Sequence, residues 1–240
     1  MRDHVVMITG AGEGMGRASV RLLTEKGAQV VAIDNREEAL CALVKEVGND
    51  LLLPVAADVS NHVEVEHAVQ VALKRWGRID DLINNAGLGR YGLLHELTHE
   101  DWQLQIDVNL TGTFNCCKAV LPHMLERAAA TDLRPAGQIL NMASEVALYG
   151  VATRTAYCAS KFGVRGLTES LRLEVQTKGI RVMGLYPGMT QTNFAGRPAS
   201  GKEGFLKPET IACQIYQMLT APPDALLSSV VILSQNVYIP

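Results

Sequence analysis

The chain has 240 residues, of which 48% are hydrophobic, 20% charged and only 5% aromatic, and its formal net charge is −3. This length and composition suit one globular α/β domain with a mainly aliphatic core. The slightly acidic balance, without a long run of Lys and Arg, argues against nucleic acid or a membrane surface as the main partner.

Short apolar runs alternate with amphipathic segments along the chain. Seven runs have the length and apolar character of strands that are buried on both faces, namely 4–10, 28–34, 51–58, 79–87, 137–144, 180–188 and 228–234. Six segments between them have helical spacing, namely 14–26, 36–47, 61–76, 99–127, 155–178 and 208–220. Strand alternating with helix predicts βαβ units and a mostly parallel seven-stranded sheet with helices on both faces.

The first loop is rich in glycine and stands between the first predicted strand and the first predicted helix. Its spacing is G-x-x-x-G-x-G rather than the strict G-x-G-x-x-G dinucleotide fingerprint. Glycines allow a tight turn and a close approach of backbone N–H groups to a pyrophosphate at a helix N-terminus. The predicted phosphate loop consists of Gly10, Gly12, Glu13, Gly14, Met15 and Gly16.

Asp34 ends the second predicted strand and is followed by Asn35 and Arg36. A carboxylate at this place fits the acceptor of the adenosine ribose 2′-hydroxyl, and a helix N-cap is the alternative reading. It would repel a 2′-phosphate, which favours NAD over NADP. Arg36 and Arg17 leave NADP open, because either guanidinium could reach a phosphate.

Further motifs follow in a fixed order along the chain. They are "TGAGEGMG" (9–16), "DV" (58–59), "NNAG" (84–87), "VN" (108–109), "MAS" (142–144), "YCASK" (157–161) and "YPGMTQT" (186–192). Over roughly residues 4–192 this set resembles the short-chain dehydrogenase/reductases. The resemblance implies a Rossmann-like doubly wound fold and hydride transfer with NAD or NADP.

The resemblance implies a catalytic set of Asn109, Ser144, Tyr157 and Lys161. Tyr157 would exchange the proton, and Ser144 would hold the substrate oxygen. Lys161 would bind the nicotinamide ribose and lower the pKa of Tyr157, while Asn109 would hold a water in a relay to Lys161. The implied cofactor contacts, besides Tyr157 and Lys161, are Asp58, Val59, Asn85, Ala86, Gly87, Pro187, Gly188, Thr190 and Thr192.

The chemistry of hydride transfer calls for the same side chains. The reaction leaves or consumes a proton on an oxygen, and a tyrosine with its ordinary pKa of about 10 is poor at this exchange. A neighbouring ammonium, together with the positive nicotinamide of the oxidised cofactor, lowers that pKa. Tyr157 and Lys161 are one helical turn apart, so their side chains share a helix face.

The substrate pocket is expected to have mixed character. Its predicted residues are Ser144, Glu145, Tyr149, Arg154, Tyr157 and Met189, with Leu88, Tyr91 and Phe205 as apolar walls. Residues 193–205 are rich in Gly, Ser and charge and read as a mobile loop that closes over the site. Glu145 points either at the substrate or into a surface network, and the sequence leaves both readings open.

The string H-E-x-x-H at 95–99 has the spelling of a zinc peptidase motif. Thr98 is predicted to cap a helix, with Asp101 completing an imperfect capping box. His95 would then precede the helix and could not share a face with His99, as zinc binding by this motif requires. No third ligand follows at the expected spacing. We therefore expect no metal, and a zinc hydrolase is the least favoured reading.

The remaining features concern location and assembly. Five scattered cysteines indicate thiols rather than a disulfide framework or a metal site. The N-terminus lacks a signal-peptide pattern and no apolar run would span a bilayer, so we expect a cytoplasmic protein without a membrane partner. Segments 99–127 and 155–178 carry apolar stripes, including Leu121, Met124 and Leu125, that predict a homodimer or homotetramer.

These observations predict a single α/β domain over residues 1–240 that is an NAD(P)-dependent oxidoreductase, with NAD favoured. Its substrate would be a small secondary alcohol or the corresponding ketone. The alternative from another class is a non-catalytic dinucleotide-binding sensor or scaffold. Such a protein is expected to have lost the Tyr, Lys or Ser of the catalytic set, and all three are present here.

Overall fold

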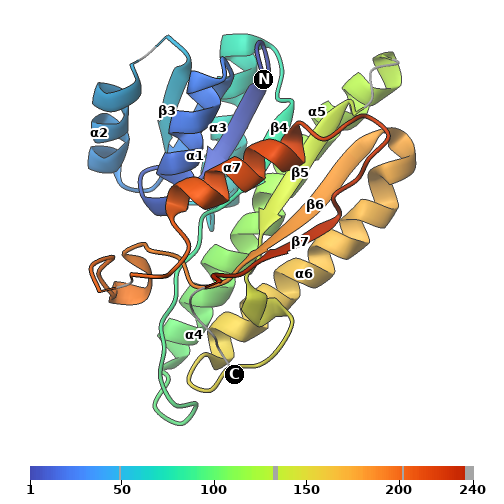
Figure 1. Cartoon of the computed structure of the whole chain (residues 1–240). Helices are drawn as coiled ribbons and strands as arrows, with labels where there is room; N and C mark the ends of the chain where they lie inside the picture. Colours follow the sequence, from blue (N-terminus) through green and yellow to red (C-terminus); the bar gives the residue numbers. More distant parts are fainter. Residues whose placement is uncertain (49, 132–134, 202, 236–240) are drawn as a thin grey trace.

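Seven parallel strands form one sheet in the order β3-β2-β1-β4-β5-β6-β7 (Figure 1). The computed structural model describes residues 1–48, 50–131, 135–201 and 203–235. The strands are β1 (Val5–Thr9), β2 (Gln29–Asp34), β3 (Leu52–Ala56), β4 (Asp81–Asn84), β5 (Gly137–Met142), β6 (Ile180–Pro187) and β7 (Ser229–Ile232). The doubly wound α/β prediction is confirmed, and the sheet is wholly parallel where a mostly parallel one was expected.

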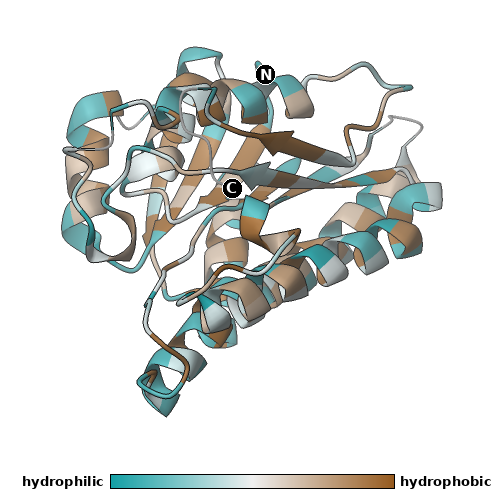
Figure 2. Ribbon diagram, turned by 60° about the horizontal axis from the view of Figure 1, so that its bottom comes forward, coloured by the Kyte–Doolittle hydropathy of each residue, from teal (hydrophilic) through white to brown (hydrophobic). Residues whose placement is uncertain are grey.

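Helices cover both faces of the sheet. They are α1 (Gly14–Glu25), α2 (Glu37–Val47), α3 (His62–Trp76), α4 (His99–Ile106), α5 (Gly112–Ala130), α6 (Thr155–Val175) and α7 (Pro208–Leu219). Helices α1, α2 and α7 pack on one face, and α3, α5 and α6 pack on the other. Figure 2 shows the apolar strands between helices whose outer faces are hydrophilic.

The strands of this sheet are apolar along their whole length because helices cover both faces. In β1, Val5 and Met7 belong to the core under α3, α5 and α6, while Val6 and Ile8 belong to the core under α1, α2 and α7. Successive side chains of a strand point to opposite faces, so a strand between two helical layers has to be apolar throughout. All four side chains are fully buried.

The segment 99–127, predicted as one helix, is divided. Helix α4 passes into a π-helical stretch, Asp107–Thr111, before α5 begins at Gly112. A π turn accommodates an extra residue and rotates the side chains that follow it. Here it contains Asn109, whose side chain is fully buried. Segment 155–178 likewise ends as a short 3₁₀ helix, Gln176–Lys178.

The start of α4 agrees with the sequence. The Thr98 hydroxyl accepts a hydrogen bond of 3.0 Å from the Asp101 backbone N–H, as an N-cap does. His95 lies in the turn before the helix, whereas His99 is its first residue. The two histidines therefore do not occupy one helix face.

The stripe proposed on 99–127 is wrong for Met124, which is fully buried. Leu121 and Leu125 pack against the same core but are only partly buried, so their place in an interface stays a prediction. The large exposed apolar side chains on α4, α5 and α6 are Leu104, Phe114, Phe162 and Leu173. None of the helices in the described part has both the length and the apolar character needed to cross a membrane.

Candidate active site

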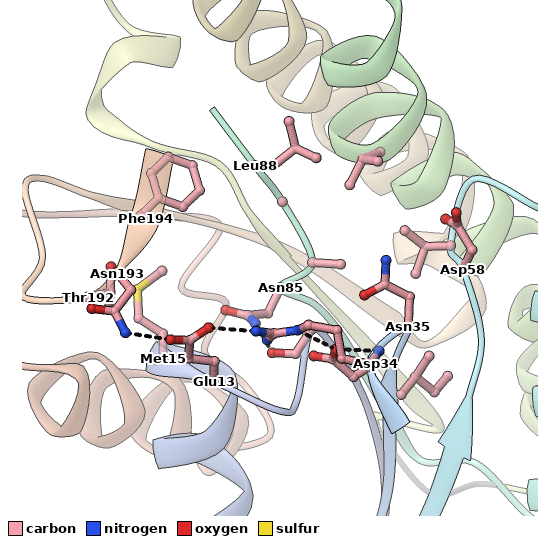
Figure 3. A pocket seen from close by; sticks show the side chains of 18 of the residues that line it. Glu13, Met15, Asp34, Asn35, Asp58, Asn85, Leu88, Thr192, Asn193 and Phe194 are labelled. Carbon is pink, nitrogen blue, oxygen red and sulfur yellow. Dashed lines mark hydrogen bonds and ion pairs between the residues drawn. The ribbon is translucent and has the colours of Figure 1, made fainter. Parts of the chain in front are cut away.

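A cavity of about 320 Å³ opens at the carboxyl ends of the first four strands (Figure 3). Its lining includes the loops that follow β1, β2, β3 and β4. Chain order reverses between β1 and β4, and ligands of open α/β sheets bind at such a switch point. Of the predicted cofactor residues, it is lined by Gly10, Glu13, Gly14, Met15, Asp34, Asn35, Arg36, Asp58, Val59, Asn85, Ala86, Gly87 and Thr192.

The phosphate loop is held tightly against the segment after β4. Asn85 donates its side-chain amide to the carbonyls of Thr9 and Gly10, both at 3.0 Å. Gly10 has φ +63°, and a Cβ on Gly16 would lie 2.0 Å from the Gly10 carbonyl oxygen. A side chain at position 16 would therefore push the loop apart.

The N-terminus of α1 is open for an anion. Its N-cap residue, Glu13, makes no side-chain cap, so the first backbone N–H groups of the helix are not capped in this way. An uncapped helix N-terminus behind a glycine loop is a phosphate site. The residues present therefore fit the pyrophosphate of a dinucleotide.

Asp34 is buried at the end of β2 and organises the adenosine side of the cavity. Its Oδ2 accepts a 2.9 Å bond from the Gly12 N–H, and its Oδ1 accepts from the backbone of Arg36 at 3.0 Å. The Arg36 guanidinium also contacts Oδ1 at 3.3 Å and donates to Glu13 at 2.9 Å. Arg17 is turned toward Glu46 on α2, at 2.6 Å. Arg36 and Arg17, the two arginines that could have bound the 2′-phosphate of NADP, are therefore both paired with carboxylates.

Tyr157 and Lys161 meet Ser144 where α6 packs beside the end of β5. All three are buried, at 8%, 4% and 9% exposure. The Lys161 Nζ lies 5.8 Å from the Tyr157 ring centroid and donates to the Met142 carbonyl at 2.8 Å. The helical turn from Tyr157 to Lys161 and the last residue of β5 thereby fix the ammonium beside the phenol.

Burial is the main influence on the pKa of Tyr157. Burial raises it, and Tyr91 raises it further, although the Ser144 hydroxyl and the charge of Arg154 act to lower it. Burial also lowers the pKa of Lys161, from 10.5 to about 8. Desolvation disfavours both charged forms, the phenolate of Tyr157 and the ammonium of Lys161.

Asn109 connects the segment after β4 to α6. Its Oδ1 accepts from the Leu88 N–H at 2.8 Å, and its Nδ2 donates to the Leu88 carbonyl and the Ser160 hydroxyl, both at 3.0 Å. A Cβ on Gly87 would lie 3.1 Å from Asn109 Oδ1 and 3.5 Å from Lys161 Nζ. Because Gly87 has no side chain, it leaves space beside the Lys161 ammonium. The predicted water relay through Asn109 is not tested by these contacts and stays a prediction.

A second cavity, of about 130 Å³, adjoins the first and shares Met15, Thr192 and Phe194 with it. The predicted substrate residues Ser144, Glu145, Arg154, Tyr157 and Met189 line it, as do Tyr91 and Phe205. Three predicted cofactor residues, Pro187, Gly188 and Thr190, line this cavity as well. Leu88 lines the first cavity instead, while Gly12, Gly16 and Lys161 line neither.

Glu145 points into the cavity and is not part of a surface network. Its side chain is buried, and its Oε2 accepts a 2.8 Å hydrogen bond from the Tyr149 hydroxyl. Tyr149 is 42% exposed and is not among the residues that line the cavity, so its contact with the substrate stays a prediction. Its hydrogen bond connects it to the cavity through Glu145.

The loop after β6, which the sequence predicted to close over the site as a whole, contributes residues that the sequence did not single out individually. Asn193 donates to Glu13 at 2.6 Å, and the Phe194 ring lies 5.5 Å from that of Tyr157. In Figure 3 the dashed lines run from Asn193 through Glu13 toward Asp34. A phenylalanine inside a loop rich in Gly and Ser was the available signal. Residue 202 of the predicted lid lies outside the described residues.

The histidine string has the geometry of a surface turn. The His95 side chain is 78% exposed, and its nearest carboxylate partner is the adjacent Glu96 at 3.9 Å. Within the described residues, no three His, Cys, Asp or Glu side chains are arranged to hold a metal ion. The expected absence of zinc stays a prediction.

Known proteins are similar to this chain in sequence and in fold. A family model described as short chain dehydrogenase matches residues 4–202. The chain is 34% identical over 244 residues to the 3-oxoacyl-(acyl-carrier-protein) reductase FabG of Thermotoga maritima, covering 97% of this chain and 96% of that one. It is 33% identical over 234 residues to the D-threitol dehydrogenase of Mycolicibacterium smegmatis, with 97% and 86% covered. The crystal structure of 3-ketoacyl-(acyl-carrier-protein) reductase from Brucella melitensis complexed with NADH matches with a TM-score of 0.90, 27% identity and 98% of each chain covered.

Proposed function

The chain belongs to the short-chain dehydrogenase/reductase family, and we propose that it interconverts a secondary alcohol and a ketone with NAD(P) as its cofactor. The observation that carries the proposal is the buried Tyr157–Lys161 pair beside Ser144. The group lies beside two adjoining cavities, one with the features of a dinucleotide site and one smaller. The activities for which two relatives are named, reduction of a 3-oxoacyl group and dehydrogenation of threitol, belong to the same class of reaction.

The cofactor would be held by residues already described. The uncapped N-terminus of α1 suits the pyrophosphate, Asp34 suits the adenosine ribose, and Gly87 leaves room beside Lys161. A bound nicotinamide supplies or accepts the hydride. The protein supplies position, charge and a proton.

Tyr157 is the proton donor for ketone reduction in this proposal. Because burial raises its pKa, the phenol is protonated at neutral pH. Ser144 lines the same cavity and would hold the carbonyl oxygen in reach of the phenol. The Lys161 ammonium, whose pKa is about 8, is mostly charged at pH 7 and stabilises the phenolate that forms. Alcohol oxidation runs the same proton path in reverse and is favoured at higher pH.

NAD is the preferred cofactor in this proposal. The buried Asp34 carboxylate stands where a 2′-phosphate would come, and Arg36 is neutralised by Asp34 and Glu13. The hydrogen bonds from Asn193 and Arg36 lower the pKa of Glu13, so it stays charged near neutral pH. A 2′-phosphate would meet two carboxylates before it met a free guanidinium.

Assembly into a dimer or tetramer fits the exposed apolar side chains on the α4, α5 and α6 surface. Phe114, Phe162 and Leu173 are 49%, 44% and 61% exposed. Large exposed apolar side chains are a feature of interaction surfaces. We infer that this surface pairs with a second copy of the chain.

The proposed function is tested with Tyr157→Phe. A panel of ketones, secondary alcohols and sugars, followed at the nicotinamide absorbance, first identifies a substrate of the unmodified protein. Tyr157→Phe removes only a hydroxyl, so NADH binding should persist while turnover falls by about 10²–10⁴-fold. Tyr216→Phe, on α7 away from both cavities, is the control and should retain turnover. Near-normal activity of Tyr157→Phe would contradict the assignment, and NADH binding without any turnover would support the sensor or scaffold alternative.

A further inference from the structure

Two guanidinium groups contact one aromatic ring in the second, smaller cavity, where the substrate is proposed to bind. Arg154 and Arg197 both line the cavity of about 130 Å³, and their Cζ atoms lie 5.0 and 5.7 Å from the Tyr91 ring centroid. The Tyr91 ring in turn meets the Tyr157 ring edge-on at 5.8 Å. One ring therefore connects both cations to the proposed proton donor.

The backbone directs Arg154 into this position. Arg154 is the N-cap of α6, three residues before Tyr157, and its carbonyl accepts from the Cys158 N–H at 2.7 Å. Thr153 before it has φ +66°, a left-handed conformation that is unfavourable for a β-branched residue. The Thr153 carbonyl accepts a 2.9 Å bond from the Gly92 N–H, which ties this turn to the segment carrying Tyr91. The backbone of Arg154 is therefore held in place by hydrogen bonds to α6 and, through Thr153, to the segment that carries Tyr91.

The charge of Arg154 is directed at the pocket and is not matched by a carboxylate. In the described part of the chain, ion pairs join Arg17, Arg36 and Arg165 to acidic side chains, but none joins Arg154 to one. Burial raises the pKa of Tyr91, Tyr149 and Tyr157, and Arg154 acts against it on all three. A guanidinium in a partly closed, low-dielectric pocket favours an anionic partner.

The other charged groups of the cavity narrow the choice of anion. Arg154 and Arg197 face one carboxylate, Glu145, which is already bonded to the Tyr149 hydroxyl. The planar fork of one guanidinium, Arg154, suits a carboxylate, whereas a phosphate dianion would meet Glu145. The cavity of about 130 Å³ is small, which indicates a short chain.

We infer that the substrate is a small oxo acid or hydroxy acid whose carboxylate binds Arg154 while its oxygen faces Tyr157 and Ser144. The inference rests on the proposed alcohol–ketone chemistry and names its substrate class. In reduction, the hydride adds to the carbonyl carbon and the Tyr157 proton adds to its oxygen. The carboxylate is unchanged and serves only to orient the chain.

The test compares acids with their uncharged esters. The unmodified enzyme with NADH is assayed with 2-, 3- and 4-oxopentanoate and with the methyl ester of each, which varies the distance between carboxylate and carbonyl. At least one acid should exceed its ester in kcat/KM by about 10- to 100-fold, as expected for charge-assisted hydrogen bonds. The difference should be mainly in KM, because the carboxylate does not react.

Variants then assign the preference to Arg154. Arg154→Gln should bring the acid-to-ester ratio close to one, and Arg154→Lys should retain part of it, because lysine keeps the charge without the planar fork. Arg197→Gln should lower the ratio less, since Arg197 is exposed. Arg172→Gln, at the far end of α6, is the matched control and should leave the ratio unchanged. Thermal unfolding of each variant checks that it is folded.

The outcomes separate this inference from the proposed function. If esters are reduced as well as all three acids, or Arg154→Gln keeps the ratio, the carboxylate assignment is overturned and the oxidoreductase assignment stands. If NADH binds but no oxo compound is reduced, the proposed function fails. Titration of the NADH complex with pentanoate then decides the anion site: binding that Arg154→Gln abolishes supports it, and the absence of binding overturns it.

Discussion

Lys161 should make the protein less stable while it makes it active. Burial lowers the pKa of its ammonium from 10.5 to about 8, so the folded protein holds this proton less tightly than the unfolded chain does. Because the pKa of Lys161 is lower in the folded protein than in the unfolded chain, its charge reduces the free energy of unfolding. This reduction is largest below pH 8, where the ammonium is charged in both states. The reduction fades as the pH rises toward 10.5.

The magnitude follows from linkage. At about 1.36 kcal/mol for each pH unit between the two pKa values, the charged ammonium costs about 3 kcal/mol at pH 7 and about 1.4 kcal/mol at pH 9.5. Lys161→Met removes this cost but leaves the buried Met142 carbonyl without its 2.8 Å partner. That loss is about 1–3 kcal/mol. We expect Lys161→Met to be inactive, and at pH 7 to be as stable as the unmodified protein or more stable by up to about 2 kcal/mol.

The pH dependence is the sharper measurement, because the lost hydrogen bond contributes equally at both pH values. Urea unfolding of the cofactor-free proteins at fixed concentration should show the advantage of Lys161→Met falling by about 2 kcal/mol between pH 7 and pH 9.5. Lys178→Met, which removes an exposed lysine just after α6, should shift stability by less than about 0.5 kcal/mol at either pH. An advantage of Lys161→Met that is the same at both pH values would refute the reasoning.

Three further predictions concern the cofactor, metal and assembly. The unmodified protein should have a higher kcat/KM with NAD than with NADP, by about 100-fold if the like-charge clash with Asp34 is several kcal/mol. Asp34→Ala should narrow that gap in steady-state assays, and an unmodified protein that used NADP equally well would contradict the role of Asp34. Dialysed protein should contain no stoichiometric zinc by elemental analysis, and His95→Ala or His99→Ala should keep turnover; loss of both metal and activity on chelation would reverse this reading. Light scattering at micromolar concentration should give the mass of a dimer or tetramer, whereas a monomer would count against pairing through α4, α5 and α6.

The sequence by itself determined the order of strands and helices and the identity of most site residues. Runs such as 28–34 are apolar throughout because both faces of the sheet are covered by helices. Such a continuous apolar run can be recognised in the sequence without a structure. Thr98 was readable as an N-cap because capping depends on residues three positions apart. Tyr157 and Lys161 share a face because they are one turn apart. Such features depend on neighbours in the chain, so local spacing predicts them.

Only the tertiary structure decided what surrounds these residues. It placed Asn193 on Glu13, positioned Arg154 and Arg197 on Tyr91, and turned Glu145 into the cavity. It also decided that burial raises the pKa of Tyr157, because desolvation depends on how many atoms from distant segments enclose the phenol. The spacing of residues shows which face of an element is apolar. It does not show which side chains from the rest of the chain fill the space beside that face, and charge, burial and pKa in the site are determined there.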